Sequence, residues 1–305
     1  MSLKNSWVDT SPFSKLILLG LLMTLSTLLS LGLFYTLNEL TWGFSIRQLS
    51  FLNLNTDPEI IWAAKFLQMF SQLGLFILPA LIFSYFISTH PFKELNLVSA
   101  PSALTMGLLF VITLLSIPFI NFLSIWNAEI HFPAFLGFIE DWMREMQSKN
   151  DILMEVILQM NSQKDVLINI LMMVILPAVG EELIFRGIIQ KQLLQWFRNP
   201  HIAILVAATL FSAFHMQFLG FFSRLLLGIV FGYFYYYSKN LWTAITAHAV
   251  NNGLALTIVL VYGSGLESDA FSSTPDLIAI IASIIGFGIA ILLLVTAYRK
   301  IQLTP

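Results

Sequence analysis

Apolar residues run through the chain in long stretches, which are separated by short polar breaks or by breaks that contain Pro or Gly. A hydrocarbon core about 30 Å thick needs about 20 apolar residues per helix, so we interpret these stretches as membrane-spanning helices. They cover 15–38, 61–88, 102–126, 165–190, 202–218, 219–238, 241–262 and 275–298. The pattern predicts an all-α fold, a polytopic transmembrane bundle of about eight spanning helices.

The segment 127–163 has a different pattern from the runs on either side of it. Apolar residues such as Phe135 and Ile139 recur at helical spacing, and charged residues such as Glu140 and Arg144 lie between them. A helix with one apolar and one charged face lies along a membrane surface rather than across it. The segment therefore predicts an interfacial amphipathic helix.

The composition agrees with a membrane protein and excludes several functions. Hydrophobic residues make up 57% of the chain and charged residues 10%, whereas soluble domains carry roughly a quarter charged residues. The lipid bilayer is therefore an expected partner. The net charge of −2 is too small to predict a nucleic-acid partner. With no cysteine, disulfides, thiolate metal ligands and cysteine nucleophiles are excluded.

Lysine and arginine residues are distributed unequally between the two sets of predicted loops, and such a bias sets the orientation of a membrane protein. With both termini in the cytoplasm, the inner loops hold eight of these residues: Lys4, Lys15, Lys93, Lys191, Arg198, Lys239, Arg299 and Lys300. The outer loops then hold only four: Arg47, Arg144, Lys149 and Lys164. The loop 263–274, which contains Glu267 and Asp269 but no Lys or Arg, also falls outside. The bias predicts an N-in, C-in topology.

The stretch AVGEELIFRGII, Ala178 to Ile189, places three charges in an apolar run. Each charge at the bilayer centre costs at least about 2.5–3.5 kcal/mol. Glu182 and Arg186 are four residues apart, so they share a helix face and can pair, whereas Glu181 projects about 100° away. A structural ion cluster and a functional site are both open interpretations of this stretch alone.

Two later spans carry further polar residues at i,i+4 spacing. One contains Phe211-x3-His215 and the other His248-x3-Asn252. His248 and Asn252 share a helix face and can both donate to one small target. Together with a spare carboxylate, these groups suit hydrolysis by activated water. In this interpretation Glu181 is the general base, His215 holds the water, and His248 and Asn252 stabilise the oxyanion.

Other interpretations of the same residues remain open. Glu181, His215 and His248 could bind zinc and leave a position for water, but the metalloprotease pattern H-E-x-x-H is absent, so a mechanism without a metal cofactor is favoured. The residues could also serve a non-enzymatic scaffold, a transporter or a proton relay. A binding module that has lost turnover is a further alternative.

At these positions the sequence resembles the CAAX-protease and bacteriocin-processing (CPBP, formerly Abi) family of intramembrane endopeptidases. The family pattern is E-E-x3-R, F-x3-H and H-x3-N, and every position of it is matched, by Glu181, Glu182, Arg186, Phe211, His215, His248 and Asn252. The resemblance spans about 165–262. It implies that Glu181 activates water, that His215 assists, that His248 and Asn252 form the oxyanion site, and that Glu182 and Arg186 support them. It also implies a protein or peptide substrate, which in some members is lipidated.

The predictions divide the chain into four parts. These are N-terminal transmembrane helices (1–126), the amphipathic segment (127–163), a CPBP-like catalytic core (164–262), and a C-terminal loop with a last transmembrane helix (263–305). We expect an integral protein of the bacterial cytoplasmic (inner) membrane.

Overall fold

The computed structural model describes residues 6–97, 99–262 and 277–303. The protein is 84% helical, and its described residues include no strand. Within these ranges, six helices are long and apolar enough to cross a membrane: Pro12–Thr41 (α1), Pro58–Ile87, Ala103–Ala128 (α6), Gln163–Phe197, Phe218–Ser238 and Leu241–Tyr262 (α13). The predicted all-α polytopic bundle is confirmed.

The two remaining predicted runs also form helices. The run 202–218 corresponds to α11 (Pro200–Phe214), an apolar helix of 15 residues that is shorter than the six spans. Helix α11 ends early because the chain turns sharply at Met216, which has a left-handed φ of 53°. The run 275–298 lies in α15 (Leu277–Leu303), which packs along α6. The predicted outer loop with Glu267 and Asp269 lies outside the described residues.

The second and fourth spans are composite helices. The second consists of α3 (Pro58–Gln72), a π-helical turn η1 (Leu73–Ile77) and α4 (Leu78–Ile87). The fourth consists of α8 (Gln163–Asn169), the π turn η3 (Ile170–Ile175), α9 (Leu176–Ile184), the π turn η4 (Phe185–Gln190) and α10 (Lys191–Phe197). In both spans a Leu-Pro-Ala sequence follows directly on the first π turn. Proline has no N–H for the regular ladder, and such positions commonly distort a helix.

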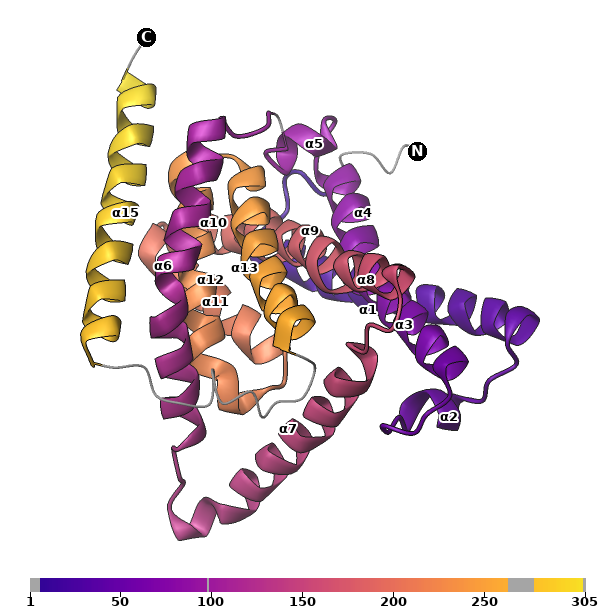
Figure 1. Ribbon diagram of the computed structural model, residues 1–305. Helices are drawn as coiled ribbons and strands as arrows, with labels where there is room; N and C mark the ends of the chain where they lie inside the picture. The colour runs from indigo at the N-terminus through magenta and orange to yellow at the C-terminus, as the bar shows by residue number, and fades with distance from the viewer. Residues whose placement is uncertain (1–5, 98, 263–276, 304–305) are drawn as a thin grey trace.

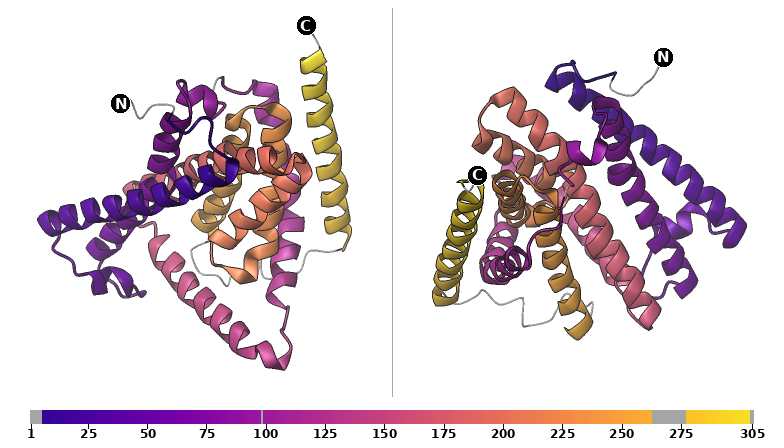
Figure 2. Two further views of the ribbon diagram at one scale, coloured as in Figure 1. Left: turned by 180° about the vertical axis from the view of Figure 1, so that it is seen from behind. Right: turned by 90° about the horizontal axis from the view of Figure 1, so that it is seen from above.

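The spans are arranged around the fourth one. Helices α6, α13, α15 and α12 (Phe221–Ser238) stand side by side, whereas α1 and α3 project to one side (Figure 1). The view from above shows α9 between these two groups (Figure 2). Helices α11 and α12 pack closely as a hairpin, since a Cβ added at Gly228 of α12 would lie 2.9 Å from the Cβ of Ala208. The fourth span is thereby buried on most sides, and it carries the charged stretch.

Short elements join the spans. They are α2 (Ile46–Ser50), α5 (Pro91–Glu94), η2 (Ala134–Leu136) and η5 (Phe218–Gly220). Helix α5 lies at the same end of the bundle as the C-terminal end of α15 (Figure 1).

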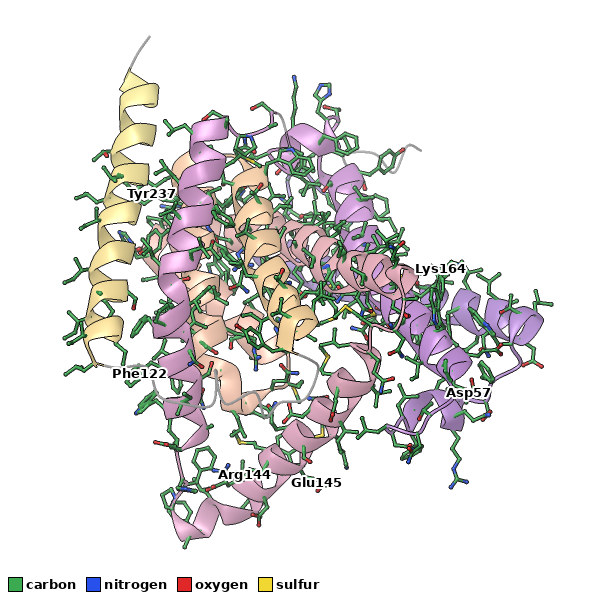
Figure 3. All side chains as sticks on the ribbon, viewed as in Figure 1. Asp57, Phe122, Arg144, Glu145, Lys164 and Tyr237 are labelled. Carbon is green, nitrogen blue, oxygen red and sulfur yellow. The ribbon has the colours of Figure 1, made fainter. Side chains whose placement is uncertain are left out.

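The predicted amphipathic helix is α7 (Gly137–Ile157), which runs from the lower end of α6 to α8 (Figure 1). Arg144 and Glu145 lie on it at the end of the molecule away from α5 (Figure 3). The carboxylate of Glu140 accepts hydrogen bonds from the Phe132 backbone N–H (2.8 Å) and from Arg144 Nε (2.9 Å), and it contacts His131 Nδ1 (2.8 Å). These contacts, the Phe132 hydrogen bond first, lower the pKa of Glu140 to about 2. The start of α7 is therefore held by a carboxylate that is ionised at neutral pH.

Candidate active site

The two adjacent glutamates lie in α9 and are both buried. Glu182 is fully buried and Arg186, in the π turn η4, is 1% exposed. Arg186 Nη1 donates to Glu182 Oε1 at 2.7 Å, as the i,i+4 spacing predicts. Its Nη2 donates to the Gly228 carbonyl at 3.0 Å, and its guanidinium lies 4.5 Å from the centre of the Phe211 ring. The arginine thus joins the fourth span to α11 and α12.

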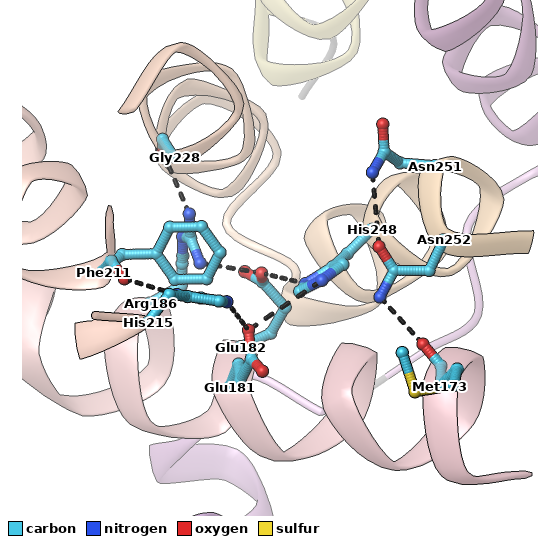
Figure 4. A network of polar contacts seen from close by, with 10 residues as sticks. All are labelled: Met173, Glu181, Glu182, Arg186, Phe211, His215, Gly228, His248, Asn251 and Asn252. Carbon is cyan, nitrogen blue, oxygen red and sulfur yellow. Dashed lines mark hydrogen bonds and ion pairs between the residues drawn. The ribbon is translucent and has the colours of Figure 1, made fainter. Parts of the chain in front are cut away.

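Glu182 also binds a histidine from another span. His248 of α13 places Nδ1 at 2.9 Å from Glu182 Oε1, so one carboxylate oxygen contacts both Arg186 and His248 (Figure 4). The His248 ring stacks on Phe231, with ring centres 5.2 Å apart. From the sequence, Arg186 is the only partner predicted for Glu182. Contact with His248 depends on the packing of α13 against α9, which spacing along one helix cannot show.

His215 lies at the C-terminal end of α11 and is oriented by its own helix. Its Nδ1 lies 2.8 Å from the carbonyl oxygen of Phe211, and the two rings pack edge to face with centres 5.0 Å apart. The F-x3-H spacing therefore has a structural reason, because the residue one turn earlier supplies both an acceptor and a ring. The second ring nitrogen, Nε2, is directed toward Glu181.

Glu181 is the point at which the two histidines meet. Its Oε2 lies 3.7 Å from His215 Nε2 and 3.9 Å from His248 Nε2. Both distances are too long for direct hydrogen bonds, and this buried oxygen has no hydrogen-bond partner among the described residues. Polar atoms at this separation can share one water molecule that contacts them from the cavity. Side chains from three helices thus converge on one carboxylate oxygen.

Asn252 lies one turn beyond His248 and lines the same cavity. Its Nδ2 donates to the Met173 carbonyl at 3.0 Å, and its Oδ1 accepts from Asn251 Nδ2 at 3.2 Å. Met173 is four residues before Pro177, which has no N–H to give that carbonyl. The Asn252 amide has two N–H donors, so one remains for another acceptor.

The site opens into a cavity of about 610 Å³. Helices α3, α7, α9, α11, α12 and α13 all contribute to its walls. The participation of α7, through residues such as Asn150 and Leu153, is not evident from the sequence. Six of the lining side chains are amides: Gln68, Gln72, Asn150, Gln217, Asn251 and Asn252. A cavity of this size and mixed polarity is typical of a ligand-binding site.

The hydrogen-bond partners assign the tautomers of the two histidines. A carbonyl oxygen and a carboxylate only accept, so Nδ1 carries the proton in both His215 and His248. In the neutral ring, Nε2 then has a free lone pair that faces Glu181. Each imidazole can accept a proton or a hydrogen bond at that atom.

A metal ion is the alternative use of the same groups. In the part of the chain that the structure describes, no group of three His, Cys, Asp or Glu side chains is placed to hold a metal ion. Glu181, His215 and His248 are the residues that would hold a zinc ion here, and such an ion would supply a Lewis acid with an open position for water.

Comparison with known families gives one match. Residues 163–254 match the model of the family described as type II CAAX prenyl endopeptidase Rce1-like. The match covers 92 of the 305 residues, so this part of the chain is similar to the CAAX-protease family. The match includes all of the motif residues and confirms the family resemblance seen in the sequence. It supports a CAAX-type intramembrane protease in general. No curated protein and no solved structure matches the chain.

The matched residues run from α8 into α13 and include the cavity-lining residues of α9, α11 and α12. Helices α1 to α7 and α15 lie outside the matched residues. Of the residues predicted for the site, Glu181, His215 and His248 meet at one point, Asn252 lies on the same cavity, and Glu182 and Arg186 form the buried pair behind them. The sequence did not identify Phe231 or Arg224 as residues of this cavity. Arg224 was visible only as a cation within an apolar run.

Proposed function

We propose that the protein is an intramembrane endopeptidase that hydrolyses peptide bonds of membrane-associated proteins or peptides with water activated by Glu181. The observation that carries the proposal is the position of Glu181 Oε2 between two Nε2 atoms, at 3.7 and 3.9 Å. A water bridging these atoms would donate one hydrogen bond to Glu181 and one to the Nε2 of His215, and Glu181 would take its proton.

The reaction then follows from the donors around the cavity. The hydroxide adds to the peptide carbonyl, and Glu181 later returns the proton to the leaving nitrogen. The free N–H of Asn252 and the Nε2 of His248 stabilise the oxyanion. Because the Nδ1–H of His248 is directed to Glu182, Nε2 can donate only from the imidazolium form of the ring.

Metal independence is part of this proposal. The support for metal independence is that Glu181 supplies a base and that the two imidazoles supply hydrogen-bonding partners for the water. We expect purified enzyme to keep its activity after chelation, with metal content measured by elemental analysis of the same sample. Activity that is lost on chelation and recovered with zinc would favour a metalloprotease instead.

The proposed location is the bacterial cytoplasmic membrane, with both ends of the chain inside. The support is the unequal distribution of Lys and Arg residues between the two sets of loops. In the structure, α5 and the C-terminal end of α15 lie at one end of the bundle, and α7 lies at the other (Figure 1). The substrate is proposed to be a protein or peptide that reaches the cavity from the membrane, with or without a lipid group.

Glu181→Gln tests the function. Glu181 Oε2 has no hydrogen-bond partner among the described residues, so the substitution removes no hydrogen bond of that atom from the folded protein. Peptides from cells that produce the wild-type protein are compared with peptides from cells that produce the variant. We expect cleavage products that depend on Glu181, and purified Glu181→Gln should cleave none of the corresponding peptides. Unchanged cleavage by the folded variant would exclude Glu181 as the base, whereas a wild-type protein that cleaves no peptide would favour a scaffold or transport role.

A further inference from the structure

Arg224 is a charged residue of the cavity that the proposed hydrolysis does not use. Among the described residues that line the cavity, it is the only Lys or Arg. It lies in the first turn of α12 and lines the same cavity as Glu181 and His215. The cation is therefore close enough to the reacting groups to influence what binds there.

The guanidinium of Arg224 is held in place by the turn before α12. Its Nη2 donates to the carbonyl oxygen of Gln217. A Cβ added at Gly220 would lie 2.9 Å from Nη2 and 3.0 Å from Nη1, so the guanidinium packs directly against this glycine. Its Nε is buried and has no hydrogen-bond partner among the described residues. The group is oriented, but most of its donors are free.

The charge of Arg224 is not neutralised by contact with an acid. Arg186 lies 2.7 Å from Glu182, whereas the described carboxylates make no contact ion pair with Arg224. A cation in a membrane protein normally pairs or faces a functional cavity. The planar guanidinium binds two carboxylate oxygens at once, which gives geometric specificity. An anionic group of a ligand is the partner that this arrangement fits.

The other walls indicate what kind of molecule carries the anionic group. The six amide side chains of the cavity offer donors and acceptors of the same kind as peptide bonds. One of them, Gln72, has a buried Oε1 without a hydrogen-bond partner among the described residues. A peptide whose carboxylate rests on Arg224 can extend past these amides to Glu181. A lipid phosphate would use the cation but leave the amides unexplained.

We propose that Arg224 binds a carboxylate of the peptide substrate and thereby selects which peptides are cut. The proposal rests on the proposed protease function and adds the substrate class to it. The carboxylate is either the C-terminus or an Asp or Glu side chain, which present the same two oxygens.

The test uses quenched fluorescent libraries of random octapeptides and the purified full-length protein in neutral detergent. One pair of libraries differs only in a free or an amidated C-terminus, and a second amidated pair includes or omits Asp and Glu. We expect the wild-type protein to prefer one carboxylate-containing library by about 10–100-fold in kcat/KM, as for a hydrogen bond to a charged group. Preference within the first pair identifies the C-terminus, and preference within the second identifies a side chain.

Three variants are compared with wild type. Arg224→Gln should remove the preference, and Gly220→Ala should weaken it by displacing the guanidinium while keeping its charge. Lys164→Gln, which removes an exposed cation outside the cavity, is the control and should keep it. No preference in the wild-type protein, or an equal loss with every library in Arg224→Gln, would overturn the proposal. So would an effect of Arg224→Gln that appears only in vesicles of anionic phosphatidylglycerol, which would indicate a lipid phosphate.

Failure of this inference is distinct from failure of the protease function. Cleavage that depends on Glu181 but shows no carboxylate preference rejects only the role of Arg224. Cleavage that persists in Glu181→Gln rejects the proposed mechanism itself.

Discussion

Glu182→Gln is the substitution for which the structure gives the clearest quantitative expectation. Glu182 is fully buried, and its Oε1 accepts from Arg186 Nη1 at 2.7 Å and contacts His248 Nδ1 at 2.9 Å. The change removes the negative charge but leaves Arg186 buried. Breaking a buried ion pair from one side costs about 3–5 kcal/mol, which is a large part of the roughly 5–15 kcal/mol that stabilises a typical domain.

Glu181→Gln is the matched comparison, because it makes the same chemical change one residue away. Glu181 has no contact ion pair with Lys or Arg, and its Oε2 has no hydrogen-bond partner among the described residues. We therefore expect its free energy of unfolding to change by about 1 kcal/mol or less, although activity is lost. The two variants should separate stability from catalysis.

The assay is thermal unfolding of both variants in the same detergent, with peptide cleavage measured in parallel. By the scaling for soluble domains, a loss of 3–5 kcal/mol corresponds to a fall in Tm of roughly 6–20 °C. Glu182→Gln combined with Arg186→Met should recover much of that loss, because removing both partners of a buried pair is often neutral. A Glu182→Gln protein that melts within about 2 °C of wild type, or that melts no lower than Glu181→Gln, would refute the assignment.

Three further predictions concern elements around the site. The pKa of Glu140 is lowered from 4.5 to about 2. The ionised carboxylate therefore stabilises the start of α7 fully above pH 4.5, and this stabilisation is lost as the pH falls toward 2. Hydrogen exchange at the start of α7 should differ between wild type and Glu140→Gln at pH 6, and this difference should shrink with acidification. The chain has no cysteine, so single cysteines can report the topology. In the N-in orientation an impermeant maleimide should label Lys149→Cys on intact cells and Lys93→Cys only after permeabilisation. The reverse pattern would show that the orientation is the opposite one. The Asn127 side chain donates to the Phe218 carbonyl at 3.1 Å and accepts from the Phe222 N–H at 3.0 Å. Asn127→Leu leaves both backbone groups unpaired and should lower the free energy of unfolding by about 1–3 kcal/mol for each group. An unchanged Tm would contradict this.

The sequence predicted those features that depend on one helix at a time. Long apolar runs predict spans because the bilayer requires about 20 apolar residues in a helix, and i,i+4 spacing predicts the pair of Glu182 and Arg186. The F-x3-H spacing likewise places His215 one turn after Phe211. These relations are local, so they need no knowledge of which helices are neighbours.

The remaining features depend on packing between spans. His248 reaches Glu182 across 66 positions of the chain, and α7 becomes a wall of the cavity only because it returns from α6 to α8. The spacing also predicts that His248 and Asn252 point to one target, yet the Asn252 amide already donates to Met173. Helical periodicity gives the face of a residue but not its partners on another helix.

Pro177 shows how a local signal and a distant contact combine. Alone, a proline in a span indicates a bend, because it removes one backbone hydrogen bond. Here Asn252 from α13 donates to the carbonyl of Met173, four residues before Pro177, at 3.0 Å. Backbone groups freed near a proline in a spanning helix can be bonded by neighbouring helices, and Asn252 makes a contact of this kind beside the π turn η3. The same contact holds the Asn252 side chain on the cavity with one N–H to spare. The irregular part of the fourth span and the position of a proposed oxyanion donor are therefore joined by one hydrogen bond.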